Sequence, residues 1–158
     1  MMRPRLAVTS MDKQIAELAV RTDHRILATW AADCAERVLP VFEKRSPEDD
    51  RPRRAIEATR AWARTGIFRM ADVRKASLSA HAAARDVEED DAARSAARSA
   101  GQAVATAHVP RHAIAAGIYA ATAVHYASDP SEAESAIMKE RDWQYRHLLK
   151  LAGGRGKK

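Results

Sequence analysis

The sequence predicts an all-α protein, and three observations lead to this fold class. Alanine recurs at helical spacing from Ala76 to Ala127, with few bulky side chains between. Alanine is the best helix former, and its small side chain lets helix backbones approach closely. Apolar stripes of helical period recur along the chain, and no segment has the alternating pattern of a strand. We therefore expect a single-domain antiparallel bundle or array of five to seven helices, packed closely through alanine.

The length and the chain ends define the expected domain. A chain of 158 residues suits one domain. We expect a flexible segment over residues 1–9, one helical domain over 10–151 and a flexible basic tail over 152–158. The glycines at 153, 154 and 156 favour the flexible tail.

The first half of the chain predicts three helices. Ser10 is a candidate cap for a short first helix. A longer helix begins near Thr22 or Asp23, and Pro40 predicts a kink or an early end near residues 36–39. Asp50 can cap the third helix, which Gly66 ends. The stripe of the second helix consists of Leu27, Trp30, Ala31, Cys34, Val38, Val41 and Phe42.

The second half predicts four more helices, at about 71–86, 90–108, 110–127 and 131–151. Gly101 in the middle of one helix costs about 1 kcal/mol relative to alanine. A close helix crossing would offset that cost, so we expect one there. Ser131 and Glu134 match a capping box for the last helix. Its expected apolar flank consists of Ile137, Met138, Tyr145, Leu148 and Leu149.

The net charge of +6 is concentrated at the two ends of the chain. Without the five terminal cations the remainder carries only +1. Nucleic-acid binding usually needs a concentrated basic face. The sequence shows none, which argues against a nucleic-acid partner, although a nucleic-acid accessory protein stays an alternative. The five cations are Arg3, Arg5, Arg155, Lys157 and Lys158.

The single cysteine and the hydropathy pattern favour the cytoplasm. Cys34 has no second cysteine to pair with, and it lies on an apolar stripe, so we expect a buried, inert thiol. No leader-like apolar core follows the first residues, and no uncharged stretch is long enough to span a bilayer. We expect no cofactor.

The histidines leave an alternative open: a small metal-binding protein or enzyme that uses His81, His108 and His112. His108 and His112 are four residues apart, but Pro110 lies between them and should break the helix. A set of His81, Asp33 and Glu36 could assemble in space, yet no spacing demands it. Helical di-iron proteins use Glu-x-x-His pairs, which this chain lacks.

Two acidic clusters are open to a binding role. They span residues 48–50 and 88–91. They could attract a basic partner. They also sit at predicted helix starts, where the helix dipole favours negative charge.

Four strings of the sequence carry a family resemblance. They are LATWAADCAERVLP at 27–40, DDRPRRAIEA at 49–58, AWA at 61–63 and AGQAVATAHV at 100–109. With them the chain resembles the Imm5-like family of immunity proteins, associated with bacterial polymorphic toxin systems. The resemblance covers about residues 22–127 and leaves out the last helix and the tail.

The resemblance implies a helical, non-enzymatic protein that binds a cognate toxin and blocks it. Such a toxin is often a nuclease or another enzyme with a basic active-site face. Asp33 and Arg37 are four apart and can instead pair with each other, and Asp33 can also bond a neighbouring helix. Arg53 and Glu57 are four apart and can pair as well. Alanine-rich faces also permit a homo-oligomer. The residues implied at the interface are Asp33, Glu36, Arg37, Asp49, Asp50, Arg53, Gln102 and His108.

Overall fold

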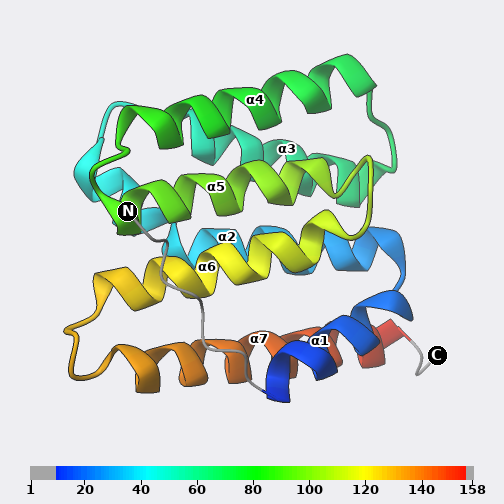
Figure 1. Ribbon diagram of the computed structural model, residues 1–158. Helices are drawn as coiled ribbons and strands as arrows, with labels where there is room; N and C mark the ends of the chain where they lie inside the picture. The colour runs from blue at the N-terminus through cyan, green and yellow to red at the C-terminus, as the bar shows by residue number, and fades with distance from the viewer. Residues whose placement is uncertain (1–9, 156–158) are drawn as a thin grey trace.

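Residues 10–155 form seven helices, in agreement with the predicted fold class (Figure 1). The computed structural model describes residues 10–155, and within them there is no strand. The expected flexible segment 1–9 lies outside the described residues, as do 156–158. The helices are α1 (Ser10–Val20), α2 (His24–Arg45), α3 (Arg51–Thr65), α4 (Met70–Asp86), α5 (Asp91–Ala105), α6 (His112–Ala127) and α7 (Ala133–Arg155).

The helices form two layers, and consecutive helices from α2 to α7 run antiparallel (Figure 1). In that view α4, α5, α6 and α1 form the near layer, and α3, α2 and α7 form the far layer. Helix α5 contacts α4 and α6 beside it and α2 and α3 behind it. Helix α4 lies at one edge, and its main contacts among residues 10–155 are with α3 and α5.

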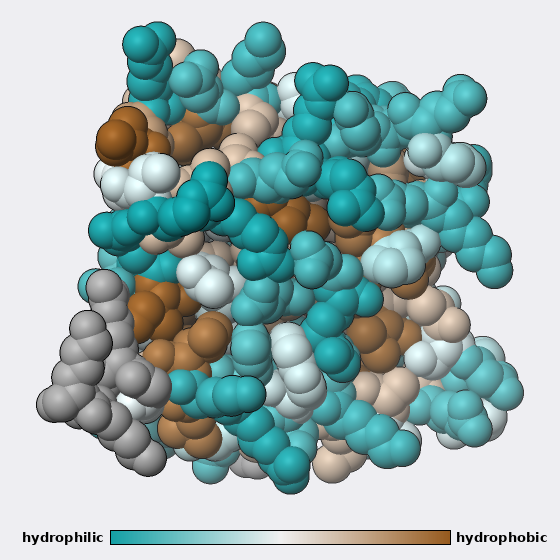
Figure 2. Space-filling view, turned by 180° about the vertical axis from the view of Figure 1, so that it is seen from behind, coloured by the Kyte–Doolittle hydropathy of each residue, from teal (hydrophilic) through white to brown (hydrophobic). Residues whose placement is uncertain are grey.

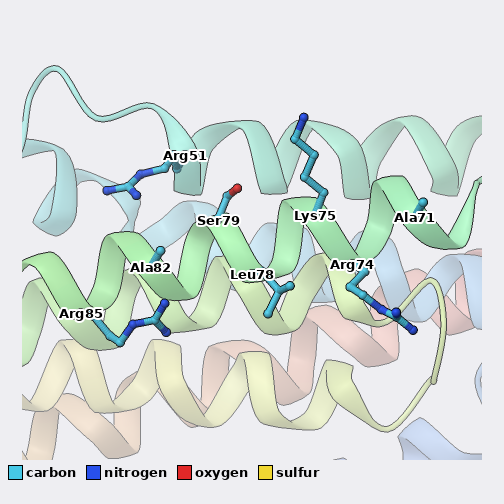
Figure 3. Close-up of a pocket in the computed structure, with 8 residues that line it drawn as sticks. All are labelled: Arg51, Ala71, Arg74, Lys75, Leu78, Ser79, Ala82 and Arg85. Carbon is cyan, nitrogen blue, oxygen red and sulfur yellow. The ribbon is translucent and has the colours of Figure 1, made fainter.

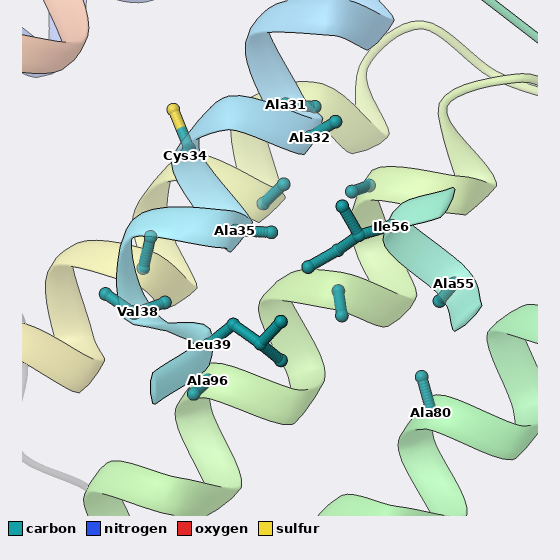
Figure 4. Packing of buried hydrophobic residues seen from close by; sticks show 14 of the residues in the cluster. Ala31, Ala32, Cys34, Ala35, Val38, Leu39, Ala55, Ile56, Ala80 and Ala96 are labelled. Atoms are coloured by element: carbon teal, nitrogen blue, oxygen red, sulfur yellow. The ribbon is translucent and has the colours of Figure 1, made fainter. Parts of the chain in front are cut away.

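Alanine forms most of the interface between the layers, as its recurrence predicted. Ala31, Ala35, Ala80 and Ala96 are fully buried in one continuous core (Figure 4). Because these side chains end at Cβ, the helix backbones approach closely across them. Trp30 and Phe42 on α2 are the largest buried side chains in this core.

Of the kink or early end expected near Pro40, the early end is wrong: α2 continues through Pro40 to Arg45. Pro40 is exposed, so the Glu36 carbonyl that loses its N–H partner is on the side of the helix open to water. The neighbouring Leu39 and Phe42 are buried and hold the helix in place. Asp23 caps the other end by accepting hydrogen bonds from two backbone N–H groups.

Several other helix ends follow the sequence signals. Gly66 ends α3 in a left-handed conformation with φ of 73°, and its N–H donates to the carbonyl of Trp62. The Asp90 side chain caps α5 through the N–H of Ala93. Asp50 precedes α3, but its carboxylate pairs with Arg54 instead of capping the backbone. The α5–α6 connection at Pro110 separates His108 from the helix that carries His112.

Helix α7 packs through a face that is apolar and polar in equal parts, which corrects part of the expected apolar flank. Ile137 and Leu148 are buried and Tyr145 packs against the core, but Met138 and Leu149 are exposed. Between the two buried residues the inward face consists of Glu140, Arg141 and Gln144. The helix also extends past residue 151, to Arg155.

Candidate functional site

Asp33 on α2 connects three helices through its carboxylate. Oδ1 accepts a hydrogen bond from Arg60 on α3 at 2.8 Å, and Oδ2 lies 2.7 Å from Nε2 of His147 on α7. Arg60 also reaches Glu36, one turn along α2, at 3.2 Å. Asp33 and Arg37 do not pair with each other, because each has a partner on another helix, and the alternative that Asp33 bonds a neighbouring helix is confirmed.

Arg37 is fixed by a carboxylate and by an aromatic ring. Its Nε and Nη2 each donate to the Glu140 carboxylate at 2.8 Å, a bidentate pair. Donating these hydrogen bonds to Glu140 raises the pKa of Arg37. The guanidinium lies 3.8 Å from the centroid of the Trp143 ring, which in turn stacks on His147 at 4.6 Å and 19°.

These contacts build one connected surface across α2, α3 and α7, which we call the platform. Figure 2 shows the molecule from this side, where hydrophilic side chains predominate and smaller hydrophobic areas lie between them. The platform consists of Asp33, Glu36, Arg37, Arg60, Glu140, Trp143 and His147.

The residues expected at the α2–α3 connection are paired beside the platform. Arg53 donates two hydrogen bonds to the Glu43 carboxylate, at 2.7 and 2.8 Å. The expected ion pair between Arg53 and Glu57 is not formed. The hydrogen bonds from Arg53 lower the pKa of Glu43. Asp49 binds Arg51 at 2.7 Å, which lowers the pKa of Asp49 in the same way.

Gln102 and His108 do not join the platform. Gln102 lies on α5, and its Oε1 is 2.7 Å from Nδ1 of His112 on α6. His108 is exposed on the α5–α6 connection. Of the eight expected interface residues, the structure thus brings three together in the platform, places three beside it at the connection and leaves two elsewhere.

The surroundings of His81 are unfavourable for the alternative function as a metal-binding protein or enzyme. His81 is held between cations: its Nδ1 lies 3.2 Å from Arg98, and burial followed by the charges of Arg98 and Arg85 lowers its pKa to about 4. A cationic surrounding disfavours a metal ion as it disfavours a proton. Within residues 10–155 no group of three or more His, Cys, Asp or Glu side chains is placed to hold a metal ion.

Four platform residues escaped the sequence analysis: Arg60, Glu140, Trp143 and His147. The last three are spaced at i, i+3 and i+7 on α7 and therefore share one face of the helix. That spacing was a usable signal. It was overlooked because the last helix was expected to pack through apolar residues.

The platform has the composition of a binding surface. Its side chains are held in fixed conformations by each other, which reduces the entropy lost when a partner binds. Arginine and tryptophan, both present here, are enriched among the residues that dominate protein interfaces. Cys34 lies directly beneath with no exposed surface, and burial raises the pKa of its thiol, so no reactive thiolate serves this face.

An all-helical protein with an ordered polar surface of this kind is a candidate protein-binding module. Residues 17–151 match the family described as "Imm-5 like putative immunity protein". The chain belongs to this family. The match includes most of α7, which the resemblance in the sequence had left out.

Neither the curated proteins nor the solved structures contain a match to this chain. Among the described helices, none combines the length and the hydropathy that a membrane span requires.

Proposed function

We propose that this protein neutralises a cognate bacterial toxin by binding it through the platform and covering the toxin's working surface. Family membership over residues 17–151 is the observation that carries the proposal. The matched region includes every residue of the platform. Neutralisation by occlusion requires only a stable complementary surface on the immunity protein and no chemical step.

The charge of the platform favours a partner with a basic surface. Its three carboxylates face two guanidinium groups, and Glu36 has the most exposed carboxylate, with 56% of its side chain accessible. The charges beside it at the α2–α3 connection, Asp50 and Arg53, are also half or more exposed. Complementary charge speeds encounter and suppresses wrong partners.

The proposal places the protein in the bacterial cytoplasm, where a toxin would reach its target. A lone buried thiol suits a reducing compartment. The charge pattern, the family and the platform all fit a protein partner better than a small substrate.

The test is co-expression of the full chain with the product of an adjacent toxin-like gene from its native host. We expect the two proteins to co-purify and growth to be restored. Glu36→Lys should weaken the complex about tenfold or more, because it places a cation against a basic partner. Glu17→Lys on α1, the same change in another exposed glutamate, is the matched control.

The two parts of the proposal fail in different ways. Absence of binding and of growth protection with every neighbouring gene product would contradict toxin neutralisation. Full protection together with unchanged affinity of the Glu36→Lys variant would contradict only the platform as the binding surface.

A further inference from the structure

The outer side of α4 carries a second charged surface, distinct from the platform. Arg74, Lys75 and Arg85 are all exposed there, and Leu78 between them has 60% of its surface accessible. Figure 3 shows Arg74, Leu78 and Arg85 projecting from one side of α4 and Lys75 from the side nearer α3. We call these four residues the α4 strip.

The spacing of the α4 strip suits one extended contact. Arg74, Leu78 and Arg85 follow each other at i, i+4 and i+11, so they lie on one face of the helix. The eleven steps from Arg74 to Arg85 span about 16 Å of helix. Small side chains, Ala71 and Ala82, line the shallow groove along the strip and leave room for a partner's side chains.

The cations of the α4 strip are not neutralised within the part of the chain that the structure describes. Arg51 at the end of the groove is bound by Asp49 and Asp86. By contrast, no ion pair joins Arg74, Lys75 or Arg85 to a carboxylate among residues 10–155. Arg98 on the neighbouring α5 adds a further positive charge, in contact with His81 of α4.

We propose that the α4 strip is a docking surface for an acidic segment of a partner protein, whose carboxylates meet Arg74, Lys75 and Arg85 and whose apolar side chain covers Leu78. This surface is additional to the platform and does not depend on the toxin-binding proposal. Among residues 10–155, the main contacts of α4 are with α3 and α5, and the side chains of the α4 strip are exposed to an incoming segment.

The apolar centre favours a protein over a nucleic acid. A nucleic-acid backbone offers phosphates to the cations but no aliphatic group to cover an exposed leucine. Proteins that bind single strands place aromatic rings under the bases, and the α4 strip has no aromatic residue. An acidic amphipathic segment supplies both kinds of contact.

The probe is a labelled 15-residue synthetic helical peptide with glutamates flanking one leucine, titrated with the full chain by fluorescence anisotropy. Its control is the same peptide with serine in place of leucine. The test variant carries R74Q, K75Q and R85Q. The matched control carries K44Q, R64Q and K150Q, three exposed cations on other helices with the same change in net charge.

We expect the Kd of the leucine peptide to rise about tenfold in the strip variant and to stay within about twofold in the control variant. Leu78→Ser should weaken binding of the leucine peptide but leave binding of the serine peptide unchanged. Circular dichroism and Tm confirm that each variant is folded.

Three results would overturn the proposal. The first is no binding of the leucine peptide at low salt. The second is equal weakening by the strip and control variants, which indicates a nonspecific charge effect. The third is tighter binding of single-stranded RNA than of the peptide with no effect of Leu78→Ser, which would assign the strip to a nucleic acid instead.

Discussion

Gly101 on α5 lies directly against the imidazole ring of His81 on α4. A Cβ atom built on Gly101 would stand 2.7 Å from Nε2 of His81, closer than real Cβ contacts allow. The Ser77 hydroxyl donates to the Gly101 carbonyl at 3.1 Å, which fixes the two helices at this distance. The close crossing predicted at Gly101 is confirmed, and His81 is the residue that requires it.

We expect Gly101→Ala to lower the free energy of unfolding by about 1–3 kcal/mol, because the cost of overpacking exceeds the gain in helix propensity. Urea denaturation measures the change. Gly153→Ala is the control: a Cβ there meets nothing within 4 Å, so the variant should be equally or more stable. Adding His81→Ala to Gly101→Ala should recover part of the loss, and strict additivity of the two changes would contradict the clash.

His81 should make the protein less stable in mild acid. Its pKa is about 4 in the folded protein and about 6.5 when unfolded, so the unfolded chain binds more protons between these values. Stability is therefore complete above pH 6.5 and falls as the pH decreases towards 4, by about 1–2 kcal/mol at a partly exposed site. Denaturation at pH 7 and 4.5 should show a smaller loss in His81→Gln, and equal losses in both proteins would refute the assignment.

Arg37→Ala should destabilise the protein by about 2–4 kcal/mol, because it leaves the Glu140 carboxylate buried without a counter-charge. The double variant Arg37→Met with Glu140→Gln should recover most of the loss. Arg146→Ala, which breaks an exposed pair with Asp142, should cost less than about 0.5 kcal/mol. Thermal and urea unfolding measure the stability of each variant. Equal losses of stability in Arg37→Ala and Arg146→Ala would contradict the prediction.

Gln144→Leu should cost about 2–4 kcal/mol although leucine is more apolar and similar in size. The Gln144 amide donates to the Gly117 carbonyl at 2.9 Å and accepts from Arg141 at 2.7 Å, so leucine removes two buried hydrogen bonds, one of them to a charged group. Gln14→Leu on the exposed side of α1 should stay within about 0.5 kcal/mol. If Gln144→Leu is as stable as the native chain, the buried polar face does not hold α7 in place.

The fold was largely predictable because its signals are local. Alanine spacing, the Asp23 cap and the left-handed Gly66 depend on neighbours within a few residues, and each predicted an element that the structure contains. The early end predicted at Pro40 was wrong because the rule considers only neighbouring residues and not packing. The buried side chains of Leu39 and Phe42 keep the helix intact around Pro40.

The candidate site was predictable only in part. Asp33, Glu36 and Arg37 were chosen from one string, and they do share one surface. Their partners Glu140 and His147 follow more than a hundred residues later, and no local rule links such distant positions. The expected i, i+4 pairs failed for the same reason, since a better-placed partner on another helix outcompetes a neighbour on the same one.

The sequence by itself determined that this chain is helical, where most helices begin and end, which stripes are buried and to which family it belongs. These properties follow from propensity, period and capping, all of which act over a turn or two of chain. Only the tertiary structure decided that α7 docks through polar residues, that the charges of α2 pair across helices and that the α4 cations stay open. Such pairings depend on which helices become neighbours, and the packing of the whole molecule sets that choice.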